Sequence, residues 1–191
     1  MAKEMMKSEK EKMLAGELYD ASDRVLSQER KSARELTHRI NYTEYGNEAV
    51  YRQILNTLLP NSAAGIIIEP PFFCDYGYNI YTGTKVFFNF NCVLLDVVPI
   101  KIGSNVLFGP SVQIYTATHP MDAKQRREGL ESAKPVIIGD DCWFGGGAII
   151  MPGVTIGERC VIGSGAVVSK NIPSDTVVAG NPAKQIPTNS T

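Results

Sequence analysis

The chain has 191 residues and a formal net charge of −1, from 19 lysine and arginine against 20 aspartate and glutamate residues. This length suits one ordinary domain with a small additional unit. The near-zero charge gives no electrostatic argument for nucleic-acid binding. The 43% hydrophobic fraction is enough to build a core, so wholesale disorder is not expected. There is no apolar run of about 18 residues, so neither a transmembrane helix nor a membrane partner is expected.

Residues 1–60 form the first predicted unit, a helical subdomain. Apolar residues recur at helical spacing over 9–18, over a longer stretch with Ser22 as a plausible N-cap, and over 47–59, where Pro60 ends the third helix. Most of the lysines and arginines lie in this unit, and we interpret them as a solvated helix face. The charged start of the chain lacks the apolar core of a secretory signal, so a cytoplasmic location is expected.

From Gly65 onward the helical spacing is replaced by a repeat of six residues. In the longest run a large apolar residue recurs without a gap, at Ile138, Phe144, Ile150, Ile156, Ile162 and Val168. The same frame occurs upstream at Ile102, Phe108 and Ile114. Glycine often follows these residues directly, and we expect it to supply the positive φ that tight turns require.

An earlier set of hexads is offset from this frame by four residues. Its members are Ile68, Cys74, Ile80, Val86, Cys92 and Val98. Three hexads predict one triangular coil of about eighteen residues, and roughly five coils would stack as parallel strands about 4.8 Å apart.

The four cysteines fit inside this solenoid. Cys74 and Cys92 are eighteen residues apart, as are Cys142 and Cys160, so each pair is predicted to stack between neighbouring coils. None of them forms a C-x-x-C pair, so neither a zinc site nor a thioredoxin-like motif is expected. A reducing compartment fits best.

The hexads stop after Ile114 and resume at Ile138. Charged residues replace the inward aliphatic ones over 115–136, so this segment is predicted to leave the solenoid as a loop. A long insertion in a regular solenoid is more often functional than accidental. His119 stands at its entrance, where it is either functional or ties the loop to its base. The other histidine, His38, is interpreted as a surface residue of the second helix.

The hexads, the Y-T-A-T-H-P stretch that opens this loop, and the I-E-P-P-F-F-C-D-Y-G-Y-N-I and F-F-N-F-N segments together resemble the hexapeptide-repeat acetyltransferases, in particular the maltose and galactoside O-acetyltransferase group. The resemblance implies a mainly β fold: a left-handed parallel β-helix over 61–186 with the loop inserted, an N-terminal helical subdomain, and a tail over 187–191. It also implies a homotrimer with active sites between neighbouring prisms. The implied reaction is acetyl transfer from acetyl-CoA to a hydroxyl of a sugar of the maltose, glucose or galactoside type, with no metal required.

The resemblance assigns catalytic roles to three residues. His119 matches the family's general base, and histidine suits this role because its unperturbed pKa lies near physiological pH. Glu131 resembles the acidic residue that holds the other ring nitrogen, with a solvated loop glutamate as the alternative. Asn89 matches an asparagine near the reacting groups, where an amide can fix the hydroxyl, bind the developing oxyanion or contact CoA. No serine or cysteine nucleophile is required, so direct transfer is expected.

Carboxylates are the candidates for binding the acceptor, because each can accept two hydroxyl hydrogen bonds. Asp75 falls where the family contacts the sugar. Asp96 is a second candidate, although the galactoside enzymes carry their acidic residue one place later, at Val97 here. Asp20 is a third, with Asp23 as an alternative alignment.

The resemblance places the CoA site along the later coils. The matching positions are Gly146, Ser164, Ser169, Lys170 and Lys184. The two lysines suit phosphate groups, while a further basic position of the family falls on Pro187. Trp143, the only tryptophan, either walls the acetyl or CoA channel or packs without a further role.

Three other interpretations remain open at this point. The acceptor could be an antibiotic, serine or a lipid-linked sugar, although Asp75 and the helical start favour a free sugar. The γ-type carbonic anhydrases use the same coils but need three histidine ligands per metal, and this chain has two histidines. A non-catalytic scaffold would not need His119, Asn89 and Glu131 around one interruption.

Overall fold

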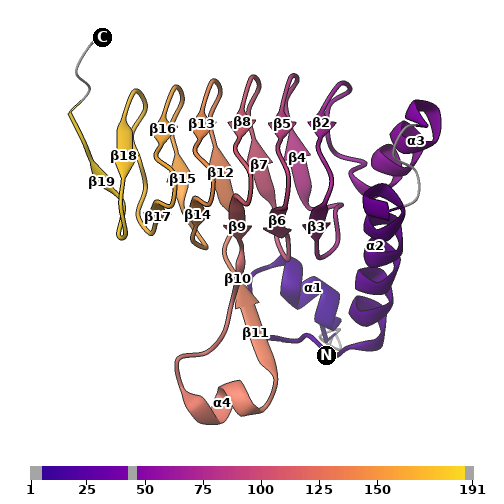
Figure 1. The fold of residues 1–191 in the computed structure, drawn as a ribbon. Coiled ribbons are helices and arrows are strands. Elements are labelled where there is room, and N and C mark those ends of the chain that lie inside the picture. The colour runs from indigo at the N-terminus through magenta and orange to yellow at the C-terminus, as the bar shows by residue number, and fades with distance from the viewer. Residues whose placement is uncertain (1–5, 43–46, 188–191) are drawn as a thin grey trace.

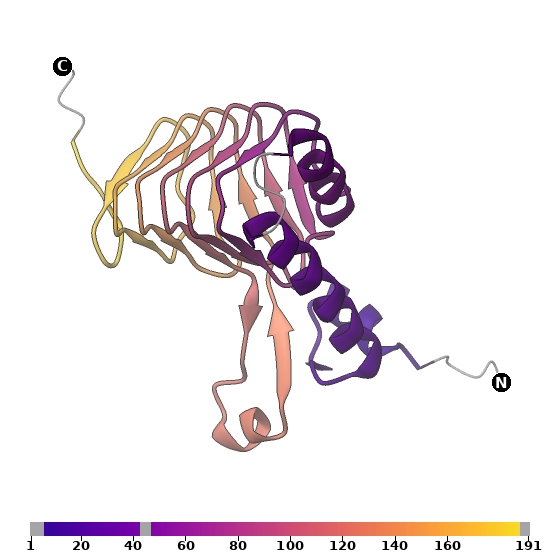
Figure 2. The ribbon, with the colours of Figure 1, turned by 45° about the vertical axis from the view of Figure 1, so that its right-hand side comes forward.

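The structure, a computed structural model, describes residues 6–42 and 47–187. Residues 1–5 and 43–46 of the predicted helical subdomain and 188–191 of the predicted tail lie outside the described residues. In the described part a β-solenoid carries helices at one end, and a hairpin leaves its side (Figures 1 and 2). The predicted mainly β fold of hexapeptide coils with an N-terminal helical region is confirmed.

Three sheets form the walls of the solenoid, and their neighbouring strands are parallel except at the C-terminal end. The first wall contains β4 (Ile80–Thr82), β7 (Ile100–Ile102), β12 (Val136–Ile138) and β15 (Thr155–Ile156). The second wall contains β2 (Ile67–Ile68), β5 (Phe87–Phe88), β8 (Leu107–Phe108), β13 (Trp143–Phe144), β16 (Val161–Ile162), β18 (Val177–Ala179) and the antiparallel β19 (Lys184–Gln185). The third wall contains β3 (Phe72–Cys74), β6 (Cys92–Leu95), β9 (Gln113–Tyr115), β14 (Ile149–Ile150) and β17 (Val167–Val168).

The strand register gives the length of each coil. Ile80 pairs with Ile100, so the first coil takes twenty residues. Ile138 pairs with Ile156, so this later coil takes the eighteen residues that three hexads predict. The difference arises where the third wall turns into the first, because the walls themselves stay in register.

The longer first coil changes the predicted stacking of the cysteines. In the register of β3 with β6, Cys92 lies beside Phe72, twenty residues earlier. The prediction that Cys74 stacks on Cys92 is therefore wrong. The register of β13 with β16 places Cys142 beside Cys160, as predicted. All four thiols are buried and unpaired.

The core of the solenoid is a column of inward side chains, one from each coil. Phe88, Phe108 and Phe144 stack along the second wall with ring centroids 4.7 Å apart at both steps. All three are at most 1% exposed. Each coil thus buries its apolar residues against its neighbours, which is the source of stability in a solenoid.

The glycines after the large hexad residues have a different role from the predicted one. The backbone of Gly139 is not in the positive-φ region. A Cβ built on Gly139 would lie 2.7 Å from the backbone nitrogen of Glu158 in the next coil. The close approach of the coils therefore requires glycine there, and the positive φ falls two residues later, on Asp141.

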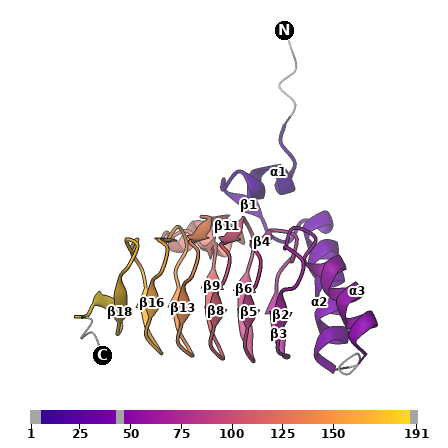
Figure 3. The same cartoon turned by 90° about the horizontal axis from the view of Figure 1, so that it is seen from above.

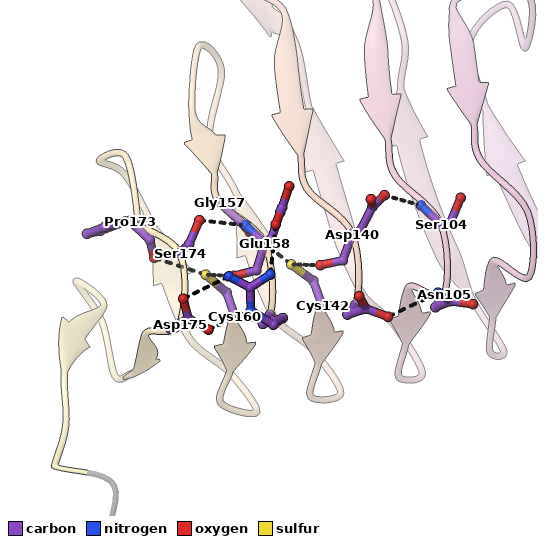
Figure 4. Close-up of polar contacts among 12 residues, drawn as sticks. Ser104, Asn105, Asp140, Cys142, Gly157, Glu158, Cys160, Pro173, Ser174 and Asp175 are labelled. Carbon is purple, nitrogen blue, oxygen red and sulfur yellow. Dashed lines mark hydrogen bonds and ion pairs between the residues drawn. The ribbon is translucent and has the colours of Figure 1, made fainter.

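A ladder of polar contacts follows this corner between the first and second walls (Figure 4). Asn105 Nδ2 donates to Asp141 Oδ1 at 3.0 Å. Arg159 donates to both carboxylate oxygens of Asp175, at 2.6 and 2.9 Å. All four residues have positive φ, which asparagine and aspartate tolerate better than most other residues. Side-chain contacts between coils thus hold the strained turns in register.

Helices α2 (Arg24–Tyr42) and α3 (Glu48–Leu58) cover the end of the solenoid next to β2 and β3 (Figure 3). Helix α1 (Glu9–Leu14) lies at the side of the solenoid, where it contacts the short strand β1 (Tyr19–Asp20) and α2. Asn41 of α2 both donates to the carbonyl oxygen of Phe72 and accepts from its N–H, each at 2.9 Å. This pair of bonds satisfies the open edge of β3, which would otherwise be free to pair with another chain.

Two of the predicted helix boundaries need correction. The first helix ends at Leu14 instead of residue 18, because Gly16 turns the chain with a φ of 71°. Asp23 caps the second helix instead of Ser22, since its carboxylate accepts from the N–H groups of Val25 and Leu26. The third helix is confirmed, with Asn47 as its N-cap.

The segment between the hexad runs forms a hairpin that projects from the solenoid (Figure 2). Its strands are β10 (Ala117–Thr118) and β11 (Leu130–Ala133), and α4 (Ala123–Arg127) lies at its tip. The short strand β1 (Tyr19–Asp20) pairs with β11 and completes a three-stranded sheet. In the described part of the chain, no helix has the length and apolar character needed to span a bilayer.

Candidate active site

The site is built where the third wall turns into the first. Three successive turns at this corner are enlarged, over residues 75–79, 96–99 and 116–135. The chain advances six residues from Leu94 to Ile100 here, but four between the equivalent positions of a later coil. We call these three turns the site corner. They carry side chains out of the stack without disturbing the register of the walls.

The three-stranded sheet of the hairpin aligns His119 with two other residues. Thr118 pairs with Ser132 in the antiparallel register of β10 with β11, so the next residues along, His119 and Glu131, lie opposite each other. Tyr19 pairs with Glu131 on the other side of β11. Side chains that lie directly across neighbouring strands point to the same face. The row Tyr19–Glu131–His119 therefore runs across one face of this sheet.

A hydrogen bond joins two members of this row. Tyr19 OH donates to Glu131 Oε2 at 2.7 Å, and Tyr19 is 1% exposed. Burial and the neighbouring carboxylate raise the pKa of Tyr19 well above its ordinary value, so the phenol remains a donor. Among the described residues no hydrogen bond joins His119 to Glu131, so the predicted contact between them stays a prediction.

A cavity of about 270 Å³, the acceptor cavity, opens beside this row. His119, Glu131 and Asp75 are among the residues that line it, together with Arg30 and Arg34 of α2. The structure thus brings three of the predicted site residues, from two separate parts of the chain, to one place.

Arg30 and Asp75 give the acceptor cavity opposite charges. Arg30 donates to Tyr76 OH at 2.7 Å and to the carbonyl oxygen of Ala21 at 2.6 Å, so its guanidinium is fixed. Burial raises the pKa of Asp75, while Arg30 and Arg34 act in the opposite direction. A carboxylate accepts hydrogen bonds from neighbouring hydroxyls, and a guanidinium donates hydrogen bonds to them.

Asp96 does not face the cavity, which corrects the prediction that it contacts the acceptor. It is 0% exposed, and its carboxylate accepts from the N–H groups of Asp75, Tyr76 and Asn79 at 3.0, 2.9 and 3.3 Å. Burial raises the pKa of Asp96 to about 7, although these hydrogen bonds oppose the shift. Asp96 is the residue that shapes the first turn of the site corner and thereby places Asp75.

Asp20 and Asp23 are both engaged in local structure. The Asp20 carboxylate accepts from the N–H and the hydroxyl of Ser22 at 2.8 and 2.6 Å, and these bonds lower its pKa. Asp23 caps α2. Neither of them lines the acceptor cavity. The choice between Asp20 and Asp23 in the alignment therefore does not change which residues line the acceptor cavity.

The remaining catalytic and CoA candidates lie elsewhere on the solenoid. Asn89 follows β5, Gly146 follows β13 and Ser164 follows β16, so all three lie at the corner between the second and third walls. The Asn89 side chain accepts from the N–H of Phe90 at 2.8 Å. Trp143 points outward from the second wall and is 56% exposed, which excludes plain packing inside this chain. None of these residues lines the acceptor cavity with His119.

The other candidates cluster toward the C-terminal end. Ser169 and Lys170 follow β17, and Lys184 lies on β19, where it pairs with Ala179. All three are exposed. Two lysines near the last coil are available to a charged ligand that runs along the stack.

Sequence reasoning missed Tyr19, Arg30, Arg34 and Tyr76, which all line the acceptor cavity. The spacing of Arg30 and Arg34 was an available signal, since residues four apart share one face of a helix. The position of Tyr19 opposite Glu131 had no such signal, because 112 residues separate them in the chain.

Two protein-family models and several known proteins match this chain. Residues 135–170 match the model of the bacterial transferase hexapeptide (six repeats), and residues 12–62 match the maltose acetyltransferase hexapeptide capping motif. Nodulation protein L of Rhizobium meliloti (strain 1021) is 49% identical over 180 residues, which cover 94% of this chain and 98% of that protein.

Solved structures agree with this match. A maltose O-acetyltransferase from Clostridium difficile 630 superposes with a TM-score of 0.93 at 46% identity, covering 97% of this chain and 99% of that one. A hexapeptide-repeat-containing acetyltransferase from Vibrio cholerae O1 biovar eltor, in complex with acetyl coenzyme A, superposes with a TM-score of 0.87 at 38% identity, covering 97% and 100%. The chain therefore belongs to the hexapeptide-repeat acetyltransferases and carries the capping motif of the maltose acetyltransferases.

Proposed function

We propose that this chain transfers the acetyl group of acetyl-CoA directly to a hydroxyl of a sugar, with His119 as the general base. The observation that carries the proposal is the alignment of His119 with Glu131 beside a cavity that also presents Asp75 and Arg30. A neutral hydroxyl is a weak nucleophile, so a base must take its proton as the oxygen bonds to the acetyl carbon. The proton then passes from His119 to the departing thiolate.

Glu131 and Tyr19 support this role of His119. One carboxylate oxygen of Glu131 accepts from Tyr19, which fixes the carboxylate in the row. The other oxygen is then placed to accept from the imidazole, which would orient the ring and stabilise the imidazolium that forms during transfer. General-base assistance of this kind contributes about 10²–10⁴-fold in rate.

The lining of the acceptor cavity favours a polyol. Asp75 offers acceptor oxygens, and Arg30 and Arg34 bring guanidinium groups to the same lining, so both kinds of hydrogen-bonding group that adjacent sugar hydroxyls need are present. The similar maltose O-acetyltransferase points to the same class of acceptor. The alternatives of an antibiotic, serine or a lipid-linked sugar remain arms of the test.

The separation of the two sets of candidates supports a homotrimer. His119 lies in the hairpin that projects from the site corner. Trp143 lies on the second wall, and Asn89, Gly146 and Ser164 lie at the corner between the second and third walls. The site would be complete if the site corner of one chain faced the second wall of a neighbour. Outward apolar side chains of that wall, Ile67, Leu107 and Trp143, are 47%, 49% and 56% exposed, as expected of a surface that a second copy covers.

In this arrangement CoA would lie along the later coils. Gly146 and Ser164 would flank the pantetheine arm, and Ser169, Lys170 and Lys184 would meet the phosphate groups near the end of the stack. The similar Vibrio protein was solved with acetyl coenzyme A, which supports this choice of donor. The buried, unpaired cysteines support a reducing compartment, and we place the reaction in the cytoplasm.

The test uses the purified full chain with acetyl-CoA and a panel of sugars, serine and drug acceptors, and measures thiol release. Sugars should be acetylated, and His119→Ala should lower kcat at least about 100-fold with the particle mass by light scattering unchanged. Gln125→Ala, an exposed change in the same hairpin, is the control and should keep the wild-type rate. Full activity of His119→Ala would reject the mechanism, and inactivity with every acceptor would favour the scaffold interpretation.

A further inference from the structure

The first turn of the site corner, over residues 75–79, carries two tyrosines whose rings lie side by side. The ring centroids of Tyr76 and Tyr78 are 5.3 Å apart, and both rings belong to one apolar cluster. Tyr76 lines the acceptor cavity, whereas Tyr78 does not. Tyr78 therefore lies behind the lining of the cavity, where it can affect the shape of the cavity without touching the acceptor.

The solenoid and α3 fix the path of this turn. The Asn79 amide donates to the carbonyl oxygens of Asp96 and Val97 at 2.8 and 3.0 Å. The Asp96 carboxylate accepts from three N–H groups of the turn. At Gly77 the backbone comes so close to the carbonyl oxygen of Leu58 that a Cβ would lie 2.2 Å from it. The turn is thus a fixed support for any element that binds its tyrosines.

Two consecutive residues of α2 bind these two tyrosines. Arg30 donates to Tyr76 OH at 2.7 Å, and Tyr78 OH donates to Glu29 Oε2 at 2.8 Å. Burial and the Glu29 carboxylate raise the pKa of Tyr78 well above its ordinary value, so its hydroxyl stays a donor. The first half of α2 is therefore held against the turn by two hydrogen bonds of opposite direction.

Lys10 of α1 holds Glu29 in place. Its Nζ donates to Glu29 Oε1 at 2.6 Å and lies 4.8 Å from the centroid of the Tyr78 ring, where a cation is attracted to the ring face. Lys10 and Tyr78 thus occupy one carboxylate oxygen of Glu29 each. We call Lys10, Glu29 and Tyr78 the Tyr78 cluster.

The Tyr78 cluster acts on the part of α2 that carries the two arginines of the acceptor cavity. Near its other end α2 is tied to β3 by the hydrogen bonds of Asn41 with Phe72. Asn41 lies eleven residues beyond Arg30, or about 16 Å along the helix at about 1.5 Å per residue. Arg34 lies four residues after Arg30 and therefore on the same face. A small tilt of α2 about its tie at Asn41 would move both guanidinium groups relative to Asp75.

We propose that the Tyr78 cluster positions the acceptor: it sets the distance between the arginines of α2 and the carboxylate of Asp75, and thereby the affinity for a polyol. The inference rests on the proposed function, because the ligand whose binding it adjusts is the sugar. No member of the cluster lines the acceptor cavity, so none of them takes part in the chemical step at His119. Hydroxyls that do not react make the same contacts in the ground state and the transition state, so the cluster acts on KM for the sugar and not on kcat.

The experiment measures kcat and both KM values of Tyr78→Phe, which removes the donor to Glu29 and keeps the ring. KM for the sugar should rise about tenfold, while kcat and KM for acetyl-CoA stay within about twofold of wild type. A tenfold change corresponds to about 1.4 kcal/mol, close to the loss of one hydrogen bond to a charged group. Glu29→Ala should match Tyr78→Phe. Glu29→Gln keeps an oxygen that accepts from Tyr78, so it should raise KM less than Glu29→Ala does.

Two further measurements separate positioning from a general loosening of the fold. Tyr51→Phe removes a buried tyrosine hydroxyl that donates to the carbonyl oxygen of Ile68, away from the acceptor cavity, so it should lower Tm and leave KM for the sugar unchanged. Monodeoxy analogues of the best acceptor report on single hydroxyls. In the wild type, the analogue without the hydroxyl that faces α2 should have a KM about tenfold above that of the parent sugar, and Tyr78→Phe should lose this difference.

The outcomes separate the two proposals. A wild-type KM for the sugar in Tyr78→Phe, or an equal rise of KM in Tyr51→Phe, overturns the positioning role and leaves the proposed function in place. The role is also overturned if the double variant Tyr78→Phe/Glu29→Ala shows the product of the two single effects, because residues that act through one bond are not additive. Undiminished discrimination against the monodeoxy analogue in Tyr78→Phe has the same consequence. No transfer by the wild-type chain to any sugar overturns the proposed function and the positioning role together.

Discussion

The hydrogen bond between Tyr19 and Glu131 can be removed by deleting one atom. Tyr19→Phe takes away the hydroxyl and leaves the ring, which is buried in a cluster with Met13, Leu26 and Val97. The packing of this cluster should therefore survive. Glu131 loses the donor at 2.7 Å that fixes one of its carboxylate oxygens.

The expected effects follow from the contact. A hydrogen bond to a charged group contributes about 1.5–3 kcal/mol to stability. For a chain of this size about 2–4 °C of melting temperature corresponds to 1 kcal/mol, so Tm should fall by about 3–12 °C. The rate should fall by about 10- to 100-fold in kcat, less than the full 10²–10⁴ of general-base catalysis, because His119 stays in place without its support. KM for acetyl-CoA should not change.

The assay measures thiol release with acetyl-CoA and the best sugar acceptor, beside thermal unfolding. Tyr51→Phe is the matched control, because Tyr51 is 8% exposed and donates to the carbonyl oxygen of Ile68 at 2.5 Å, away from the acceptor cavity. It should lose stability and keep kcat. If Tyr19→Phe also keeps kcat, or if both variants lose it equally, Tyr19 has no role in positioning and the reasoning is refuted.

Further predictions concern the turns of the site corner. Asp96→Asn should lower the free energy of unfolding by about 1–3 kcal/mol, because an amide N–H₂ would face the N–H of Asn79; a Tm equal to wild type would contradict this. Burial raises the pKa of Asp96 to about 7, so the folded chain binds the carboxyl proton more tightly than the unfolded chain does. The stability that this proton contributes is fully present below about pH 4 and is lost as the pH rises through about 7. The Tm advantage of the wild type over Asp96→Asn should therefore be larger at pH 5 than at pH 8, and an advantage that grows with pH would show the opposite shift. Gly77→Ala should cost more than the roughly 1–2 kcal/mol of left-handed strain expected for Gly65→Ala, since its Cβ would lie 2.2 Å from the carbonyl oxygen of Leu58 while nothing lies within 4 Å at Gly65; equal losses in chemical denaturation would refute this.

Much of the fold followed from the period of the sequence. A large residue every six positions predicted the coils and their parallel stacking, because only a solenoid gives each such residue an equivalent neighbour. The period could not predict the twenty-residue coils. The upstream hexads, from Ile68 to Val98, are also buried, so their burial fits a spacing of six, but residues eighteen apart in this stretch are not neighbours in adjacent coils. Cys74 is buried as expected, for example, but beside Leu94.

The site was predictable where one loop carried it and not where distant segments met. His119 and Glu131 lie in the same hairpin, and the interruption of the hexads pointed to it. Asp96 looked like a site residue because its type and place in the chain fit, yet three backbone N–H groups occupy its carboxylate. Nothing in the sequence reports which carboxylate turns inward, because that depends on the path of the turn it closes.

The site corner separates two demands that most enzymes must meet with the same residues. The walls repeat a fixed spacing and carry the buried apolar column, while the turns over residues 75–79, 96–99 and 116–135 differ in length at a single edge. A change of length in these turns would alter the lining of the acceptor cavity and leave the register of the walls behind them unchanged.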